Sequence, residues 1–288
     1  MKQSLQMDNE NNWDLIITPR KKWYDLQLRQ VWQYRDLISL FVQRDLVSRY
    51  KQTILGPIWF LIQPLFTSII YTVVFGQIAN LPTDGLPQML FYMSGNVMWN
   101  YFQGCLNGTS NTFISNAGIF GKVYFPRLVT PISIVISNLI SFAIQFVFFL
   151  AFWLFFFMRG SAISLTSWAF TLPLLVLLMA GLGLGFGIII SSMTTKYRDL
   201  SYLVGFGVGL WMYITPVIYP VSAIPERWRW LATFNPISPV IETFRAGFLG
   251  AGQSSWLRLG YSFVFMLVVL FIGIVIFNRV EKTFIDTV

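Results

Sequence analysis

The segment of this chain that comes nearest to a nucleotide-binding motif is Gly-Ile-Phe-Gly-Lys-Val, at residues 118–123. A phosphate loop has an additional glycine at a fixed upstream position and a Ser or Thr after its lysine, which binds magnesium. This segment lacks the upstream glycine and has Val123 in the place of the hydroxyl residue. We therefore do not expect this chain to bind nucleotide at this segment.

The residue types that perform acid–base, covalent or metal chemistry are scarce. The chain has no His, one Cys and only 12 Asp and Glu residues, so the usual general base near neutral pH and the commonest metal ligand are both missing. We predict no catalytic residue and no metal site. A proton- or sodium-coupled carrier has ionisable groups inside its membrane segments, and none is expected here. A pump built from this chain would need a separate ATPase subunit.

The composition is that of a protein that lies in lipid. Of the 288 residues, 55% are hydrophobic and 11% are charged, and the mean hydropathy is +0.61, whereas roughly 25% of residues are charged in a soluble domain. We predict an all-α integral membrane protein, with a cytoplasmic segment at 1–53 and a transmembrane domain at 54–288. Six stretches are long enough to cross about 30 Å of hydrocarbon as helices: 55–79, 87–106, 128–158, 168–193, 201–220 and 256–278.

The Lys and Arg residues predict the orientation, because they are retained on the cytoplasmic side. With the N-terminus inside, the inner segments hold fifteen Lys and Arg residues and the outer segments hold five. Both termini are therefore expected in the cytoplasm.

A seventh crossing at 231–250 is disfavoured, because charges and prolines at lipid-facing positions are costly. We predict that 221–255 forms short re-entrant helices at the outer face, with an ordinary surface loop as the alternative. Glu242 and Arg245 are three residues apart and are expected to pair on one helix face. The residues assigned to this outer gate are Asn235, Pro236, Glu242 and Arg245.

Residues 34–42 are predicted to form an amphipathic helix. The apolar residues Tyr34, Leu37, Ile38, Phe41 and Val42 fall on one side at helical spacing. Such a helix lies along a membrane interface or packs on a partner protein.

Two further patterns concern helix packing and partner binding. Gly181 with Gly185, Gly183 with Gly187, and Gly205 with Gly209 are spaced so that helix backbones can approach closely. Residues 116–127, between the second and third spans, combine aromatic residues with Lys and Arg. We predict that these aromatics are exposed and dock a partner, the alternative being that they anchor at the headgroup level.

Aromatic residues are abundant, with 28 Phe, 12 Tyr and 11 Trp. Sugar rings have apolar faces that can lie against aromatic rings. The hypothesised channel lining, from the first and fifth spans, is Trp59, Phe60, Tyr71, Phe75, Trp211, Tyr213 and Tyr219.

A series of short motifs runs along nearly the whole chain: Arg35-Asp36-Leu37, Arg44-Asp45, the run from Arg49-Tyr50-Lys51 to Trp59, Gln63-Pro64-Leu65, 122–127, 197–200, 215–219 and Asn235-Pro236. In content and order this series resembles one known family, the permeases of the type-2 ABC exporters for O-antigen, capsule and teichoic acid.

The resemblance implies a homodimer with two ATP-binding subunits in the bacterial inner membrane. ATP and Mg would bind to those partners, with no cofactor in this chain and no nucleic acid. The cargo would be a polyprenyl-diphosphate-linked glycan such as that of lipopolysaccharide. An interfacial gate helix is implied at Arg35, Asp36, Arg44, Asp45, Arg49, Tyr50 and Lys51. ATPase coupling is implied at Asn116, Phe120, Lys122, Tyr124, Phe125, Pro126, Arg127, Arg198 and Asp199, and Lys196 to Leu200 would make the smaller contact.

Three other functions are weighed against this one. A drug or lipid exporter is the main alternative, because hydropathy does not distinguish the cargo. A membrane glycosyl or acyl transferase would need a convergent acid or base pair, and a scaffold or channel would need no ATPase.

Overall fold

The fold is helical throughout the part of the chain that a computed structural model describes, which is residues 28–51, 53, 56–120, 122–123, 125–194, 197 and 199–284. The α-helices are α1 (Leu28–Gln33), α2 (Arg35–Tyr50), α3 (Trp59–Tyr71), α4 (Gln88–Ser110), α5 (Thr112–Phe120), α6 (Val129–Met158), α7 (Leu172–Thr194), α8 (Leu200–Ile214), α9 (Arg229–Phe234), α10 (Ser238–Leu249) and α11 (Trp256–Phe284). A π-helical segment, Thr72–Ile78, continues α3, and a 3-10 turn, Ser167–Thr171, precedes α7.

Four of the predicted spans are confirmed as helices that are long and apolar enough to cross a membrane. They are Trp59–Ile78, Val129–Met158, Ser167–Thr194 and Trp256–Val280. Their boundaries agree closely with the predicted ones, because each runs between polar or proline-containing turns.

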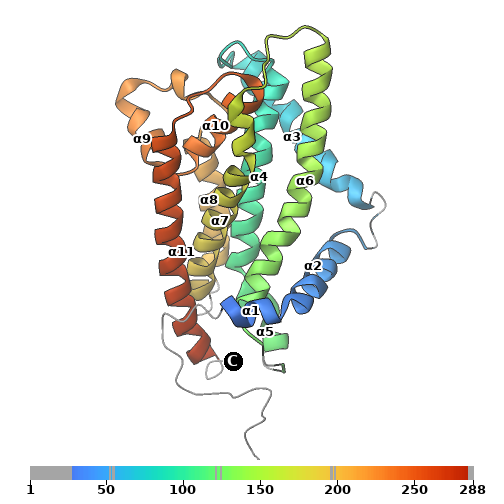
Figure 1. Ribbon diagram of the computed structural model, residues 1–288, viewed down its shortest axis with the longest axis vertical. Coiled ribbons are helices and arrows are strands. Elements are labelled where there is room, and N and C mark those ends of the chain that lie inside the picture. The colour runs from blue at the N-terminus through green and yellow to red at the C-terminus, as the bar shows by residue number, and fades with distance from the viewer. Residues whose placement is uncertain are drawn as a thin grey trace, which may run out of the picture.

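The helix α4 differs from these four because it lies at the centre of the bundle. Sixteen of its 23 residues are buried, and it contacts α3, α6, α7, α8 and α10 (Figure 1). A helix surrounded by other helices needs no apolar outer surface. This explains how α4 carries polar residues such as Asn96 and Asn100 and is less apolar than its neighbours.

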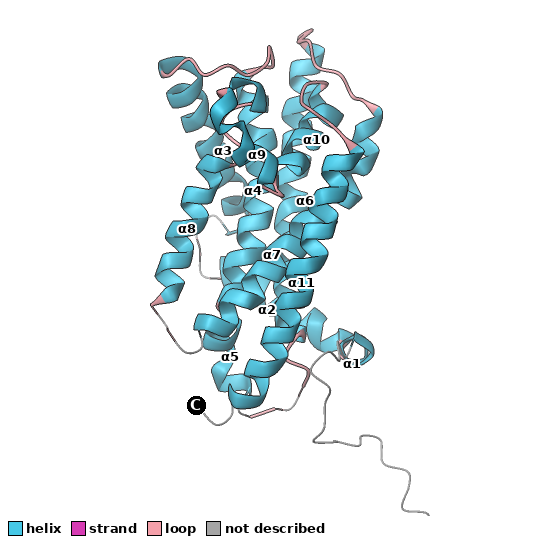
Figure 2. Ribbon diagram, turned by 90° about the vertical axis from the view of Figure 1, so that its left-hand side faces the viewer, coloured by secondary structure: helices cyan, strands magenta, loops and turns pink. Residues whose placement is uncertain are grey.

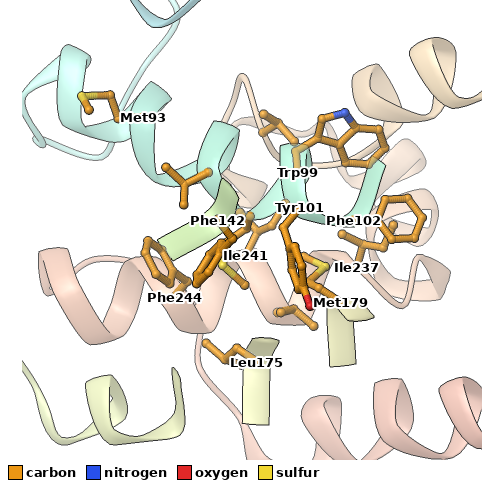
Figure 3. Close-up of a cluster of buried hydrophobic side chains, with 14 of the residues drawn as sticks. Met93, Trp99, Tyr101, Phe102, Phe142, Leu175, Met179, Ile237, Ile241 and Phe244 are labelled. Carbon is orange, nitrogen blue, oxygen red and sulfur yellow. The ribbon is translucent and has the colours of Figure 1, made fainter. Parts of the chain in front are cut away.

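The main core forms around α4. Trp99, Tyr101 and Phe102 extend from this helix into a cluster that also contains Phe142 of α6 and Phe244 of α10 (Figure 3). Aromatic contacts are frequent in this cluster, including Tyr101 with Phe142 at a centroid distance of 5.2 Å. Because lipid gives helices no hydrophobic reason to associate, such dispersion contacts hold the bundle together.

The glycine pairs of α7 behave as predicted. An added Cβ on Gly183 would lie 2.9 Å from the carbonyl oxygen of Phe102 in α4, and one on Gly185 would lie 3.1 Å from the backbone nitrogen of Leu270 in α11. The two pairs thus face opposite ways, and α7 packs tightly between α4 and α11. By contrast, Gly205 in α8 has nothing within 4 Å among the described residues.

The helix α8 is shorter than predicted. It ends at Ile214, whereas the apolar pattern indicated a span that continues to residue 220. At 15 residues it is about 22 Å long, using a rise of 1.5 Å per residue. The helix stops one residue before Thr215-Pro216, since the residue that precedes a proline is disfavoured in the helical conformation.

The two ends of the bundle carry different structures. The helices α1 and α5 and the C-terminal end of α11 lie at one end, and α9, α10 and the connection between α6 and α7 lie at the other (Figure 1). The second view shows α8 at the side of the bundle rather than inside it (Figure 2). We call these the α5 end and the α10 end.

We predict that Gly183→Ala lowers the melting temperature of the purified chain in detergent. The new methyl group would lie 2.6 Å from Cβ of Cys105 and 2.9 Å from a backbone carbonyl, and such overpacking costs about 1–3 kcal/mol. Gly205→Ala is the matched control, because it adds the same methyl group in open space. Equal melting temperatures for the two variants would contradict the close packing of α7 on α4.

Candidate functional site

The apolar face of the helix at 34–42 packs on the chain itself. Val31 and Phe41 are buried, and Tyr34, Leu37 and Ile38 pack against the same cluster, which includes residues of α5 and α6. Arg35, Asp36 and Ser39 are exposed on the other side. The predicted amphipathic face is therefore confirmed, and its apolar side is covered by this chain's own α5–α6 region.

The prediction that Phe120 and Phe125 form an exposed docking surface is wrong. Both rings are buried, with centroids 5.6 Å apart, and Phe41 of α2 lies 5.7 Å from Phe125. The Arg127 guanidinium lies 5.5 Å from the centre of the Phe120 ring and is also buried. The rings are covered because α2 folds back along this end of the bundle, and the sequence pattern did not show that contact.

The exposed residues at the α5 end are different ones. Lys122 and Val123 are exposed at the turn between α5 and α6, and Ile114, Ser115 and Gly118 are exposed on α5. Of the other residues assigned to coupling, Asn116 and Pro126 are buried and Asp199 is exposed at the start of α8. Tyr124, Lys196 and Arg198 lie outside the described residues, as do the side chains of Arg49 and Tyr50.

The charged residues of α2 pair with their neighbours on the exposed side. Arg44 Nη2 lies 2.8 Å from Asp45 Oδ1, and Arg35 Nε lies 4.0 Å from Asp36 Oδ1. Lys51 is exposed at the end of the helix. Solvent-exposed pairs of this kind contribute roughly 0–1 kcal/mol, so packing of the apolar face, rather than the ion pairs, holds α2 in place.

At the α10 end, Arg245 lies in a fully enclosed polar cluster. Its Nη1 donates to the carbonyl oxygen of Pro216 at 2.6 Å and its Nη2 to that of Val217 at 2.7 Å, while its Nε donates to Ser94 Oγ at 3.2 Å. Its guanidinium carbon lies 3.7 Å from the centre of the Phe91 ring. Arg245 thus binds the two carbonyl groups that are left without helical partners where α8 ends.

Glu242 neutralises this arginine, as predicted from their spacing. Its Oε1 lies 3.4 Å from Arg245 Nη1, and both side chains are less than 5% exposed. The other carboxylate oxygen accepts a hydrogen bond from the backbone N–H of Gln253 at 3.1 Å. Every residue of α10 is buried, so the alternative of an ordinary surface loop is wrong for this part of 221–255.

Asn235 and Pro236 tie the chain ahead of α10 to two other helices. Asn235 Nδ2 donates to Thr215 Oγ1 at 2.8 Å, and Ser262 Oγ of α11 donates to the carbonyl oxygen of Pro236 at 2.7 Å. Gly95 in α4 allows the chain at Val217 to pack directly on α4, since an added Cβ would lie 2.8 Å from the Val217 carbonyl oxygen. The four residues assigned to the outer gate therefore belong to one connected layer.

The seven aromatic residues assigned to a channel do not share one cavity. Trp59 and Phe60 line a cavity of about 440 Å³ between α3, α4 and α6, and Tyr213 and Tyr219 line another of about 310 Å³ at the α10 end. Trp211 instead packs between Phe102 and Phe186, with centroid distances of 5.3 and 5.2 Å. Tyr71 and Phe75 pack against each other at 5.5 Å.

The larger cavity also contains polar residues that the sequence analysis did not select. The carboxamides that line it are Gln63, Asn100, Gln103, Asn138 and Gln145. The signal was present in the sequence, since polar residues recur three or four positions apart within apolar helices.

The fold and these sites define a helical integral membrane protein with enclosed polar layers and no cluster of metal-binding residues among the described ones. The family model for the ABC-2 type transporter matches residues 36–249. The chain belongs to this family, whose members are membrane subunits of ABC transporters and are not catalytic on their own.

Curated relatives align over nearly their whole length. The O-antigen export system permease protein RfbA of Klebsiella pneumoniae is 29% identical over 252 residues, covering 87% of this chain and 94% of the relative. Its namesake in Myxococcus xanthus is 27% identical, covering 77% and 83%. The polysialic acid transport protein KpsM of Escherichia coli is 24% identical, covering 86% and 95%.

We predict that Arg245→Leu strongly destabilises the α10 end. The variant leaves the carboxylate of Glu242 and two carbonyl groups buried without their partner, and breaking a buried ion pair typically costs about 3–5 kcal/mol. Melting temperature and limited proteolysis of the 250–255 turn measure the effect. Arg159→Leu, at an exposed position, is the control. The double variant Arg245→Leu/Glu242→Leu should recover part of the loss, and no difference between Arg245→Leu and Arg159→Leu would contradict this role.

Proposed function

We propose that this chain is the transmembrane subunit of an ATP-driven exporter that moves a lipid-linked polysaccharide across the bacterial inner membrane. The observation that carries the proposal is the similarity, over most of the chain, to relatives that are named as permeases for O-antigen export and as a polysialic acid transport protein. The family match over residues 36–249 supports the same function. The cargo we propose is a glycan on a polyprenyl-diphosphate lipid, and export of a drug or another lipid is the alternative.

The proposed topology has six crossings, formed by α3, α4, α6, α7, α8 and α11, with the α5 end in the cytoplasm. Four of these helices are apolar enough to span by composition alone. Burial of α4 inside the bundle supports including it, because its polar residues do not face lipid. The α10 layer would then be re-entrant from the outer face, where protein satisfies its backbone.

The proposed complex is a homodimer of this chain with two ATP-binding subunits, which bind ATP and Mg. The docking surface that we propose at the α5 end is formed by the exposed residues Ile114, Ser115, Gly118, Lys122 and Val123. These residues, rather than the buried rings of Phe120 and Phe125, would touch the ATP-binding subunit. A small apolar patch beside a cation is suited to a partner's groove with an acidic rim.

Contacts of α5 suggest how ATP binding reaches the bundle. The Phe113 ring of α5 stacks on Phe277 of α11 at 4.7 Å, and its backbone N–H donates to Ser191 Oγ of α7 at 3.4 Å. Closure of the ATPase pair against α5 would therefore press first on α7 and α11. The cluster of Phe41, Phe120 and Phe125 would carry the same displacement to α2.

The proposal is tested by co-purifying the chain with its ATPase subunit and reconstituting the complex in liposomes that contain lipid-linked glycan. We expect glycan to become accessible on the opposite face only when ATP is added. A catalytically inactive ATPase is the control and should show no translocation. Export of a drug or lipid without any glycan export would favour the alternative cargo, and transport by this chain alone would overturn the proposal.

The docking surface predicts a specific loss of assembly. The double variant Lys122→Glu/Val123→Asp makes the exposed turn negative, like the acidic rim that we propose on the partner. Like charges at an interface cost several kcal/mol, so we expect the amount of co-purified ATPase to fall at least about tenfold. Phe120→Ala should instead lower the melting temperature through loss of packing. Arg159→Glu reverses a charge at the C-terminal end of α6, where the connection to α7 begins, and it should leave co-purification unchanged. Normal co-purification with the double variant would contradict the assignment.

A further inference from the structure

Three helices bring uncharged polar faces together between α3, α4 and α6. On each helix the polar residues are three or four positions apart, so they lie on one side. They line the cavity of about 440 Å³, and they are Gln63 and Thr67 of α3, Asn100 and Gln103 of α4, and Asn138, Ser141 and Gln145 of α6. Two of these helices, α3 and α6, are otherwise apolar enough to span a membrane.

None of the fourteen residues that line this cavity is charged. A carboxamide both donates and accepts hydrogen bonds, and so does each hydroxyl group of a sugar. A phosphate or a carboxylate would need cations or a cluster of donors, because burying a charge without a partner is very costly. The lining is therefore suited to an uncharged ligand that is rich in hydroxyl groups.

Aromatic rings complete the walls. Trp59 is half exposed at the start of α3, and Phe60 lies beside it. Tyr101 and Phe142 line the same cavity from α4 and α6. Rings next to carboxamides provide apolar faces for C–H groups and polar partners for hydroxyl groups, as sugar binding requires. The volume falls within the roughly 300–1,000 Å³ range of ligand pockets.

We propose that the cavity between α3, α4 and α6 is a binding site for uncharged sugar residues of the transported glycan. The inference rests on the proposed function and adds a substrate class to it, namely a glycan segment without acidic groups. The diphosphate of the carrier lipid would have to bind elsewhere, because this lining offers no cation.

Carboxamides also serve to hold membrane helices together, and the pair of Asn100 and Gln145 does so here. Asn100 Nδ2 donates to Gln145 Oε1 at 3.3 Å, which joins α4 to α6. If all of these polar residues only joined helices, the three helices would be in contact and no cavity would lie between them. Instead the cavity remains open beside this hydrogen bond, and α3 contributes polar residues to it from the opposite side.

The site can be tested by cysteine labelling, because the single native cysteine, Cys105, is buried. Gln63→Cys places a thiol on the cavity wall, and Ser39→Cys places one on the exposed side of α2, outside the lining and outside the predicted spans. The probe is mannohexaose, an uncharged sugar oligomer, and the comparison is a sialic acid hexamer, which is anionic. At a concentration of about twice the Kd, mannohexaose should slow maleimide labelling of Gln63→Cys about threefold by mass action.

The proposal requires that Ser39→Cys be labelled at the same rate with and without mannohexaose, and that the sialic acid hexamer protect neither position. Equal labelling of Gln63→Cys with and without mannohexaose would overturn it, and so would equal protection by both oligomers.

A second variant tests the site in the full complex, through the ATP hydrolysis that glycan stimulates. Gln103→Met keeps the side-chain length but removes a hydrogen-bonding group, and it should weaken glycan-stimulated ATP hydrolysis by the full complex roughly three- to tenfold in apparent affinity. ATPase co-purification and the melting temperature should remain unchanged. If the wild-type complex exports glycan but Gln103→Met matches it in apparent affinity, only this inference fails. If the wild-type complex moves no glycan, the proposed function itself fails.

Discussion

The structure depends on one constraint: polar groups inside a lipid-embedded bundle must find their partners within the protein, because hydrocarbon offers none. The chain meets this constraint by placing its most polar long helix, α4, at the centre, where the other helices enclose it. The same constraint is satisfied just after the end of α8, where Arg245 donates hydrogen bonds to the carbonyl groups of Pro216 and Val217, which have no helical partner. The broken backbone at the α10 end is therefore compatible with membrane depth.

Burial and close packing divide the bundle into two parts. The helices α4, α7 and α11 are held together at their glycines, and α5 is attached to α7 and α11 through Phe113. The helix α3 contacts α4 and α6 and exposes large apolar residues along its length, and α8 has Val208 as its one buried residue. The closely packed central unit can therefore keep its packing while the less buried helices beside it shift by small movements.

Much of the fold could be predicted from composition and periodicity. The long apolar helices, the amphipathic face of α2 and the Glu242–Arg245 pair follow from local spacing, which each segment carries in its own sequence. The burial of Phe120 and Phe125 could not be predicted in this way, because it depends on α2 folding back over residues about eighty positions later in the chain. The end of α8 follows locally from Thr215-Pro216, but the partner of the buried Pro216 and Val217 carbonyl groups is Arg245, which lies beyond α9 in the chain. The polar cavity needs three helices at once, so no single segment reveals it.

Gly205 and Gly209 lie four residues apart on one side of α8, and both have open space beside them within the described part of the chain. The exposed rings of Tyr202, Phe206 and Tyr213 lie on the same side. A helix of another protein could bring its backbone close to α8 at the two glycines, while these rings fit between the side chains of that helix. The glycines of α7 already contact their neighbours, whereas those of α8 form a notch between aromatic rings that the described part of this chain leaves unfilled.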